Sequence, residues 1–303
     1  MVLDRLESMS TLLAAVEAGS LSAASRKLGM PLATVSRKVS ELEARLRTRL
    51  VNRTSRRLTL TDAGRSYVAA CKRILEDIEE AERAAAGEYS APRGDLTITA
   101  PIVFGRLHVL PVAMEFLKAY PDIDLRLALA DRLINLLEDQ VDLAVRIGDL
   151  PDSSLVAMRI GAIRRVVCGS PEYLAKRGTP KSAGDLGTHD CITFEGLASA
   201  DAWTFAKGKS QASVAVHSRL LVNTAEAAID AAIAGIGLTR VLSYQAAAAI
   251  EAGTLAVVLR EFEPAPWPVS LIHAGQPLLP QKLRAFLDFA APRLKARLSR
   301  IAA

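Results

Sequence analysis

Positive charge gathered on a helical pattern near the amino end is the feature that most constrains the fold of this 303-residue chain. Ten arginines and lysines but only two glutamates lie between Ser20 and Leu60, a surplus of eight positive charges. The whole chain has a net charge of only +5, so the remainder is slightly acidic. Such asymmetry is typical of a protein that binds a polyanion through one segment.

The charged segment has the pattern of short helices separated by glycine turns. Apolar residues recur at helical spacing up to Gly19, a short helix ends at Gly29, and Pro31 lies near the start of a third helix. A tight turn before a basic helix predicts a helix-turn-helix that contacts DNA. The buried side of the third helix is predicted to carry Val35, Val39, Leu42 and Leu46, and its polar, cationic side Thr34, Arg37 and Lys38.

A small basic β-hairpin is predicted after the third helix. Arg53, Arg56 and Arg57 flank a polar turn, after which Leu58 and Leu60 alternate with threonines. This is the pattern of a wing, which would add further positive charge beside the helix-turn-helix.

A long helix is predicted from Asp62. Its apolar side chains step by four and three residues alternately, which is the pattern of a two-stranded coiled-coil seam, with a plain core helix as the alternative. Cys71 is expected to fill that dimer seam. The predicted seam residues are Tyr67, Cys71, Ile74, Ile78, Ala81 and Ala85.

Strands and helices alternate from Asp95 onward. The order βαβαβ favours a mainly parallel sheet with helices on both faces, and later segments predict a second α/β lobe. Ligands of open α/β sheets bind at the carboxyl ends of the strands. A small-molecule cleft is therefore expected between the two lobes.

Several classes of protein are disfavoured by what the sequence lacks. The three cysteines and four histidines have no metal-ligand or disulfide spacing, so we expect no metal and no cofactor. A peroxide-sensing pair of Cys168 and Cys191 is a minor alternative. No P-loop, nucleophile elbow or metalloprotease helix is present, which argues against an enzyme. Apolar stretches are too short for a membrane span and Asp4 and Glu7 fall where a secretory signal would be apolar or basic, so we expect no membrane association and a cytoplasmic protein.

The segment "GSLSAASRKLGMPLATVSRKVSELEARLRTRLVNRTSRRLTLTDAG", from Gly19 to Gly64, resembles the LysR-type transcriptional regulators. The resemblance continues more weakly through "YPDIDLRL", "DLAVRIG", "SPEYL" and "HDC". It implies an α/β protein with an N-terminal winged helix-turn-helix, a long linker helix that dimerises, and a two-lobed effector domain similar to type 2 periplasmic binding proteins. The implied limits are 1–61 for the DNA-binding domain, 62–91 for the linker helix, 92–161 with 268–303 for lobe 1, and 162–267 for lobe 2.

The resemblance also implies roles for individual residues on DNA. Leu32 and Ala33 would meet base edges in the major groove, and Ser36 with Arg37 would hold phosphates. Family members often have glutamine where Leu32 stands, which favours apolar contact with a base here, and a glycine where Arg47 stands. The full expected DNA-binding set is Leu32, Ala33, Thr34, Ser36, Arg37, Lys38, Arg53, Ser55, Arg56 and Arg57.

For the effector domain the resemblance implies a small ligand, for example a carboxylate, at a strand-to-helix junction whose N–H groups would receive it. It further implies a homo-oligomer, a dimer through the linker helix and a homotetramer, that reads an interrupted palindrome in double-stranded DNA. The expected effector-binding residues are Thr99, Ala100, Pro101, Ile102, Val103, Ala130, Arg146, Gly148, Asn223 and Thr224.

Two other functions stay open at this point. One is a small-molecule binding protein or enzyme whose N-terminal module serves only assembly, which would show no salt-sensitive affinity for DNA. The other is a constitutive DNA-binding protein with no effector, which would bind without sequence preference.

Overall fold

The computed structural model describes residues 2–53, 58–85, 91–131, 136, 139–150, 155–194, 202–207, 210–275 and 279–302. The chain divides into two compact units, Met1–Gly94 and Asp95–Ala303. The first of these is helical apart from a small hairpin, and the second is α/β. Among the described residues, no helix is long and apolar enough to cross a membrane.

Unit 1 packs three short helices against a longer fourth one. Two buried clusters join them, one around Leu12 and Val39 and the other around Ala24 and Val35. The turns are set locally: the Ser20 hydroxyl caps α2 by accepting from the Ala23 amide. The elements are α1 (Val2–Glu17), α2 (Leu21–Leu28), α3 (Leu32–Leu46), β1 (Val51–Arg53), β2 (Leu58–Leu60) and α4 (Asp62–Ala85).

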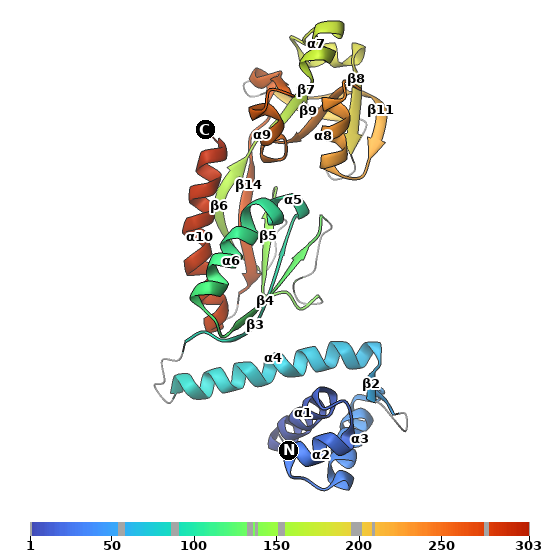
Figure 1. Cartoon of the computed structure of the whole chain (residues 1–303), viewed down its shortest axis with the longest axis vertical. Coiled ribbons are helices and arrows are strands. Elements are labelled where there is room, and N and C mark those ends of the chain that lie inside the picture. The colour runs from blue at the N-terminus through green and yellow to red at the C-terminus, as the bar shows by residue number, and fades with distance from the viewer. Residues whose placement is uncertain are drawn as a thin grey trace. The chain divides into compact units, whose positions relative to one another are not determined.

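Unit 2 begins with a five-stranded sheet, lobe 1, in the order β4-β3-β5-β14-β6. Helices α6 and α10 pack together beside this sheet, with α10 along β6 (Figure 1). The elements are β3 (Gly94–Ala100), α5 (Ile102–Phe104), the π-helix η1 (Gly105–Val109), α6 (Leu110–Ala119), β4 (Ile123–Leu129), β5 (Leu143–Ile147), β6 (Leu155–Ile163), β14 (Trp267–Ala274) and α10 (Gln281–Ala302).

The lobe 1 sheet is mixed, which corrects the expectation of a mainly parallel one. β3 and β5 pair in parallel, but β14 pairs antiparallel with both β5 and β6. The strand β14 comes from the far end of the chain, since the whole of lobe 2 lies between β6 and β14 in the sequence, so it is not part of the regular βαβ alternation. The second helix of the βαβαβ pattern, which the sequence predicts at 132–139, falls mostly outside the described residues.

Lobe 2 is a second five-stranded sheet, in the order β11-β8-β12-β7-β13, with a separate two-stranded hairpin of β9 and β10. The chain crosses between the two sheets at Arg164 and again at 263–266. The elements are β7 (Arg165–Gly169), α7 (Pro171–Arg177), the 3-10 helix η2 (Ala183–Thr188), β8 (Asp190–Phe194), β9 (Ala202–Lys207), β10 (Ser210–Ala215), β11 (His217–Val222), α8 (Ala225–Ile233), β12 (Leu238–Leu242), α9 (Ser243–Glu251), β13 (Ala256–Val258) and the 3-10 helix η3 (Arg260–Phe262).

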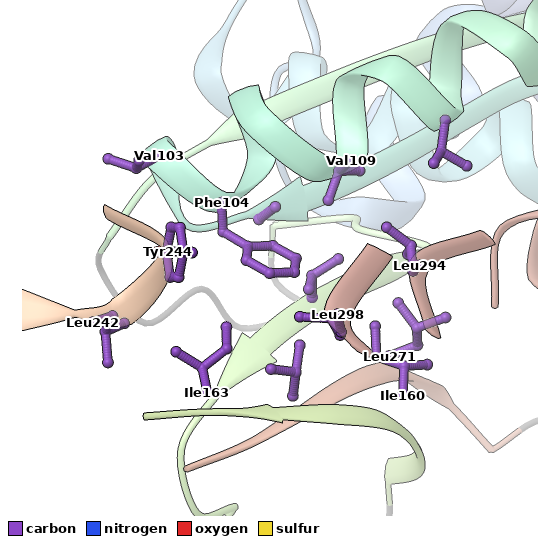
Figure 2. Close-up of a cluster of buried hydrophobic side chains, with 14 of the residues drawn as sticks. Val103, Phe104, Val109, Ile160, Ile163, Leu242, Tyr244, Leu271, Leu294 and Leu298 are labelled. Atoms are coloured by element: carbon purple, nitrogen blue, oxygen red, sulfur yellow. The ribbon is translucent and has the colours of Figure 1, made fainter. Parts of the chain in front are cut away.

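One hydrophobic cluster runs through both lobes. It includes Phe104 and Leu298 from the lobe 1 side and Leu242 and Tyr244 from the lobe 2 side. Figure 2 shows the rings of Phe104 and Tyr244 next to each other in this cluster, and their centroids are 5.4 Å apart in an edge-on arrangement. The two lobes are therefore held together by continuous apolar packing as well as by the two chain crossings.

Gly64 is a position where unit 1 tolerates no side chain. A Cβ placed there would lie 1.9 Å from the backbone oxygen of Leu50. The close approach of α4 to the connection between α3 and β1 therefore requires glycine at this position. We expect Gly64→Ala to destabilise unit 1 by about 2 kcal/mol or more, because the neighbour is rigid backbone.

The destabilisation of unit 1 is measured by hydrogen exchange of the α1 and α4 amides in increasing concentrations of urea. Both tryptophans, Trp203 and Trp267, lie in unit 2, so their emission should keep its own urea transition. Gly187→Ala is the control, since a Cβ there meets nothing within 4 Å and should change stability by less than about 0.5 kcal/mol. Equal effects of the two substitutions would contradict the account of Gly64.

Candidate nucleic-acid interface and effector site

Helix α3 is fixed by its apolar side and presents the opposite side to solvent. Val35, Val39 and Leu42 are buried, as expected, within the clusters of unit 1. Leu46, also expected on this side, is exposed because the helix ends there. On the outer side the Arg37 side chain is 68% exposed and its Nη1 is 3.8 Å from Glu41, four residues along the helix.

The outer side of α3 carries most of the residues expected to reach DNA. Leu32 is 48% exposed, which leaves much of a large apolar side chain in contact with water. Ala33 is exposed and Thr34 and Ser36 are half-buried beside it. These side chains are brought together on one surface of the helix.

Lys38 corrects the expectation of a uniformly cationic face. Its side chain points inward, the residue is only 8% exposed, and Nζ lies 2.7 Å from Glu7 Oε2 and 3.9 Å from Asp4 Oδ1. Helical spacing explains the difference, because Lys38 lies next to Val39 and one turn after Val35, at the edge of the buried stripe. Its charge therefore holds α3 to α1.

The turn after α3 takes a left-handed conformation without glycine. Arg47 has φ 51° and ψ 32°; its amide donates to the Ala44 carbonyl at 3.2 Å, and the following Thr48 amide donates to the Glu43 carbonyl at 3.1 Å. The Glu43 carboxylate accepts from the amides of Leu50 and Val51, at 2.8 and 3.1 Å. These hydrogen bonds offset the cost of a side chain in this conformation, about 1 kcal/mol.

The wing expected after α3 is present as the β1–β2 hairpin. Val51 pairs with Leu60 and Arg53 with Leu58, and the Leu58 amide donates to Gly19, which ties the hairpin to the end of α1. The expected contacts of Ser55, Arg56 and Arg57, and the side chain of Arg53, lie outside the described part of the chain.

The prediction that Cys71 fills a dimer seam on α4 is wrong. That thiol is fully buried inside its own unit, where α4 packs on α1. Burial, then the nearby Cys71 thiol, raise the pKa of Tyr67 to about 12. Among the seam residues whose side chains the structure describes, Ile74 and Ala81 are exposed, and Tyr67 and Ile78 are half-buried.

The expected effector residues of lobe 1 gather where β3 and β4 end. Thr99 and Ala100 are fully buried, and the Thr99 hydroxyl donates to the Ala128 carbonyl at 2.9 Å. The Ala130 amide donates to the Ala100 carbonyl at 3.0 Å. Pro101, Ile102 and Val103 then begin the helix, with Ile102 exposed.

Asp131 occupies the start of this helix and was missed by the sequence analysis. Its Oδ1 accepts from the Ile102 amide at 3.0 Å. The N–H group expected to receive an effector carboxylate is thus already bound to a carboxylate of the chain, and Asp131 would repel a second anion. A capping acid about thirty residues away in sequence gives no local signal.

The other expected effector residues lie at two further places. Arg146 lies near the end of β5 and Gly148 directly after it. Burial lowers the pKa of Arg146, and Gly148 has φ 112°. Asn223 and Thr224 lie in lobe 2 at the start of α8, where the Thr224 hydroxyl caps the helix by accepting from Ala227.

The junction of the lobes is aromatic. His108 lies in the π-helix η1 between α5 and α6, 4.9 Å from the Phe104 ring and 5.6 Å from the Tyr244 ring, measured between centroids. Burial, then the charge of Arg297, lower the pKa of His108 to about 4, so the imidazole is neutral at physiological pH.

A Cys168–Cys191 redox pair is excluded by the sheet. Cys168 pairs with Thr239 and Cys191 pairs with Leu238, which are neighbours on β12, so the two thiols point to opposite faces. Burial raises the pKa of each to about 12, which keeps both as unreactive thiols. In the described part of the chain, no three His, Cys, Asp or Glu side chains are grouped to hold a metal.

Comparison with known proteins agrees with this arrangement. A family model described as a LysR substrate binding domain matches residues 90–295, and one described as a bacterial regulatory helix-turn-helix protein of the lysR family matches residues 6–65. An HTH-type transcriptional regulator of Xanthomonas campestris pv. campestris is 36% identical over 92% of this chain and 82% of its own length.

Two solved structures are similar over nearly the full length. CrgA, a LysR-type transcriptional regulator from Neisseria meningitidis, is 31% identical with a TM-score of 0.60, covering 95% of this chain and 98% of its own. The Vibrio cholerae virulence activator AphB is 26% identical with a TM-score of 0.59, covering 95% and 98%. The chain therefore belongs to the LysR family of transcriptional regulators, with a helix-turn-helix DNA-binding domain followed by a substrate-binding effector domain.

Proposed function

We propose that two or more copies of this chain bind an interrupted palindrome in promoter DNA and change their arrangement when a small molecule binds the regulatory domain. The chain acts as a regulator and not as an enzyme. Because the target is chromosomal DNA, this function places the protein in the cytoplasm. The proposed domain limits are 1–61, 62–91, 92–161 with 268–303, and 162–267.

The proposal rests mainly on the side chains that α3 exposes to solvent. Arg37 is exposed on the side opposite the buried Val35 and Val39, so its guanidinium is free to approach phosphates while the helix stays fixed. Leu32 and Ala33 lie at the start of the same helix, where a recognition helix meets base edges. The proposed contacts are Leu32, Ala33, Thr34, Ser36 and Arg37 from α3, with Arg53, Ser55, Arg56 and Arg57 from the wing.

An effector can shift the oligomer only by binding one arrangement more tightly than another. The lobes share one core and meet at Phe104 and Tyr244, so a ligand held between them would alter packing in both. We propose that the effector site is bordered by Thr99, Ala100, Pro101, Ile102, Val103, Ala130, Arg146, Gly148, Asn223 and Thr224.

Exposed apolar side chains support assembly. Met114 is 50% exposed on α6, together with exposed Leu110 on the same helix and exposed Leu107 on the preceding η1, while Leu221 is exposed on the edge strand β11 of lobe 2. Such patches mark contact sites in soluble proteins. We propose that they join regulatory domains, that the linker helices join DNA-binding domains, and that the two contacts together build a tetramer.

Replacing Arg37 by alanine tests the phosphate contact. We expect Arg37→Ala to weaken binding to DNA from upstream of its own gene and to a random duplex alike, by about tenfold, since it removes a charge-assisted hydrogen bond. The slope of log affinity against log salt should become shallower by about one per bound subunit, because each subunit then neutralises one phosphate fewer.

Fluorescence anisotropy at several salt concentrations measures both quantities. Arg5→Ala is the matched control, because it removes the same charge from an exposed position on α1. Unchanged affinity of Arg37→Ala at about 0.15 M salt would refute the assignment of α3.

Leu32 is expected to affect sequence preference and not general affinity. Leu32→Ala removes an apolar contact with a base and should relax selection at one position, whereas Leu32→Gln offers a bidentate partner for adenine and should shift the selected base. Selection from a random duplex library, followed by sequencing, reads out both. Identical selected sites for all three proteins would place Leu32 away from the bases.

The proposed apolar contact between regulatory domains is tested by placing a charged side chain in it. Met114→Lys and Leu221→Glu should each lower the mass measured by light scattering during gel filtration, because a buried charge is costly at an interface. Lys118→Glu, which alters charge on the same helix without removing apolar surface, should keep the wild-type mass. A mass that stays unchanged in both apolar variants would exclude these surfaces.

A further inference from the structure

Two arginines lie side by side on one face of the lobe 2 sheet. Arg165 opens β7 and Arg240 lies on β12, and the antiparallel register pairs Arg165 with Leu242 and Arg240 with Val167. Cross-strand partners share a face, as do residues two apart on one strand. Both guanidinium groups therefore project from the same side of the sheet as diagonal neighbours.

Arg240 is enclosed but incompletely bonded. It is 7% exposed, its guanidinium lies 5.5 Å from the centre of the Trp203 ring, and its Nη1 donates to the Thr204 carbonyl at a long 3.4 Å. Its Nε is buried and has no hydrogen-bond partner among the described residues. A buried N–H without a partner is rare in folded proteins.

Arg165 is in a similar position. Its guanidinium stacks 4.4 Å from the centre of the Trp267 ring and its Nη2 donates to the Ala265 carbonyl at 2.9 Å. Its Nε is also buried, with no partner in the described part of the chain. The pair thus has two buried Nε–H groups without a described partner, and each guanidinium lies against one indole ring.

Two described acids near the pair, Glu263 and Asp149, act on arginines other than Arg240. Glu263 is held by Arg164, with its Oε2 3.2 Å from Nη1, and Asp149 acts on Arg165. No ion pair among the described residues reaches Arg240. Burial, then the charge of Arg165, lower the pKa of Arg240 to about 10, so it is still a cation at neutral pH. A buried cation of this kind is strongly unfavourable unless an anion joins it.

We propose that Arg165 and Arg240 form the anion-recognition site of the regulatory domain and bind the carboxylate of a small organic acid. This deepens the proposed function and rests on it, because that acid would be the effector. A guanidinium edge matches the two oxygens of a carboxylate, and the indole rings of Trp203 and Trp267 offer apolar surface to the organic part. At the start of α5, in contrast, the Ile102 amide already donates to the Asp131 carboxylate.

The cover of Arg240 comes from the hairpin of β9 and β10. Trp203 and Thr204 lie on β9, which forms a two-stranded sheet with β10 and is not hydrogen-bonded into the five described strands of lobe 2. Trp203 and Phe205 of β9 are also buried in a hydrophobic cluster with Leu238, so a ligand that reaches Arg240 must open part of this packing.

The test compares thermal unfolding of the full-length protein in chloride with unfolding in acetate, benzoate, succinate or phosphate at equal ionic strength. Wild type should be stabilised by at least one carboxylate, with a rise in melting temperature that saturates. Arg240→Met should melt higher than wild type in chloride, because it removes a buried unpaired cation, and should lose the carboxylate response, with binding weakened about 30-fold or more. Arg219→Met, an exposed arginine of the same lobe that pairs with Asp190 at 3.4 Å, is the matched control and should respond as wild type does.

Arg240→Lys and Arg165→Met extend the test to proteins that keep different parts of the site. Arg240→Lys keeps the charge but loses the two-pronged edge, so it should bind the carboxylate more weakly than wild type, and Arg165→Met should do the same. Should Arg240→Met fail to fold, these two variants decide the question by the same measurement.

The outcomes separate this inference from the proposed function. No stabilisation by any carboxylate, stabilisation by phosphate alone, or an equal response in all variants would overturn the site, even when the protein still binds promoter DNA with steep salt dependence. Loss of DNA binding by the wild-type protein would instead overturn the proposed function. A carboxylate that alters the wild-type DNA footprint but not that of Arg240→Met would support both.

Discussion

The burial of one side of α3 is the constraint on which the DNA-binding unit depends. Val35, Val39 and Leu42 lock the helix into the core of unit 1, and this alone decides that Arg37 faces outward. The inward Lys38, bound to Glu7, adds a charged contact to the same packing. A contact with phosphate requires a guanidinium whose direction is fixed before DNA arrives, because ordering a long side chain on binding costs free energy. The apolar side of the helix supplies that order.

Packing of a different kind joins the two lobes of the regulatory unit. Phe104 and His108 from lobe 1 meet Tyr244 from lobe 2, and one hydrophobic cluster passes between the lobes. Close-packed cores change between discrete arrangements more readily than they deform by small amounts. An anion at Arg165 and Arg240, close to the chain crossings at Arg164 and 263–266, would therefore favour one arrangement of lobes over another. That preference is what an effector needs in order to act on distant helices.

Much of the fold was predictable from local patterns, while the site was predictable only where it lies on one element. Helical spacing and glycine turns predicted α3 and its buried stripe, and alternation predicted the wing and the α/β regulatory unit. The pattern misplaced Lys38, because a position at the edge of a stripe is decided by whether an acid such as Glu7 faces it. Asp131, Tyr244 and Arg240 gave no signal, since each acquires its role from residues far away in sequence. The mixed sheet of lobe 1 was likewise not predictable from local patterns, because the whole of lobe 2 separates β14 from its partner strands β5 and β6 in the sequence.

The two crossings and the shared core also determine how such a protein can diversify. The boundary at Gly94 separates two units with their own cores, so recombination there can exchange a whole sensor between regulators and leave both pieces intact. Recombination inside the regulatory unit has no comparable boundary between separate cores. A transplanted lobe 2 would bring its part of the shared cluster, including Leu242 and Tyr244, against lobe 1 side chains that do not fit it. New ligand specificity should therefore spread by swapping complete sensors or by point changes within one, and not by shuffling single lobes.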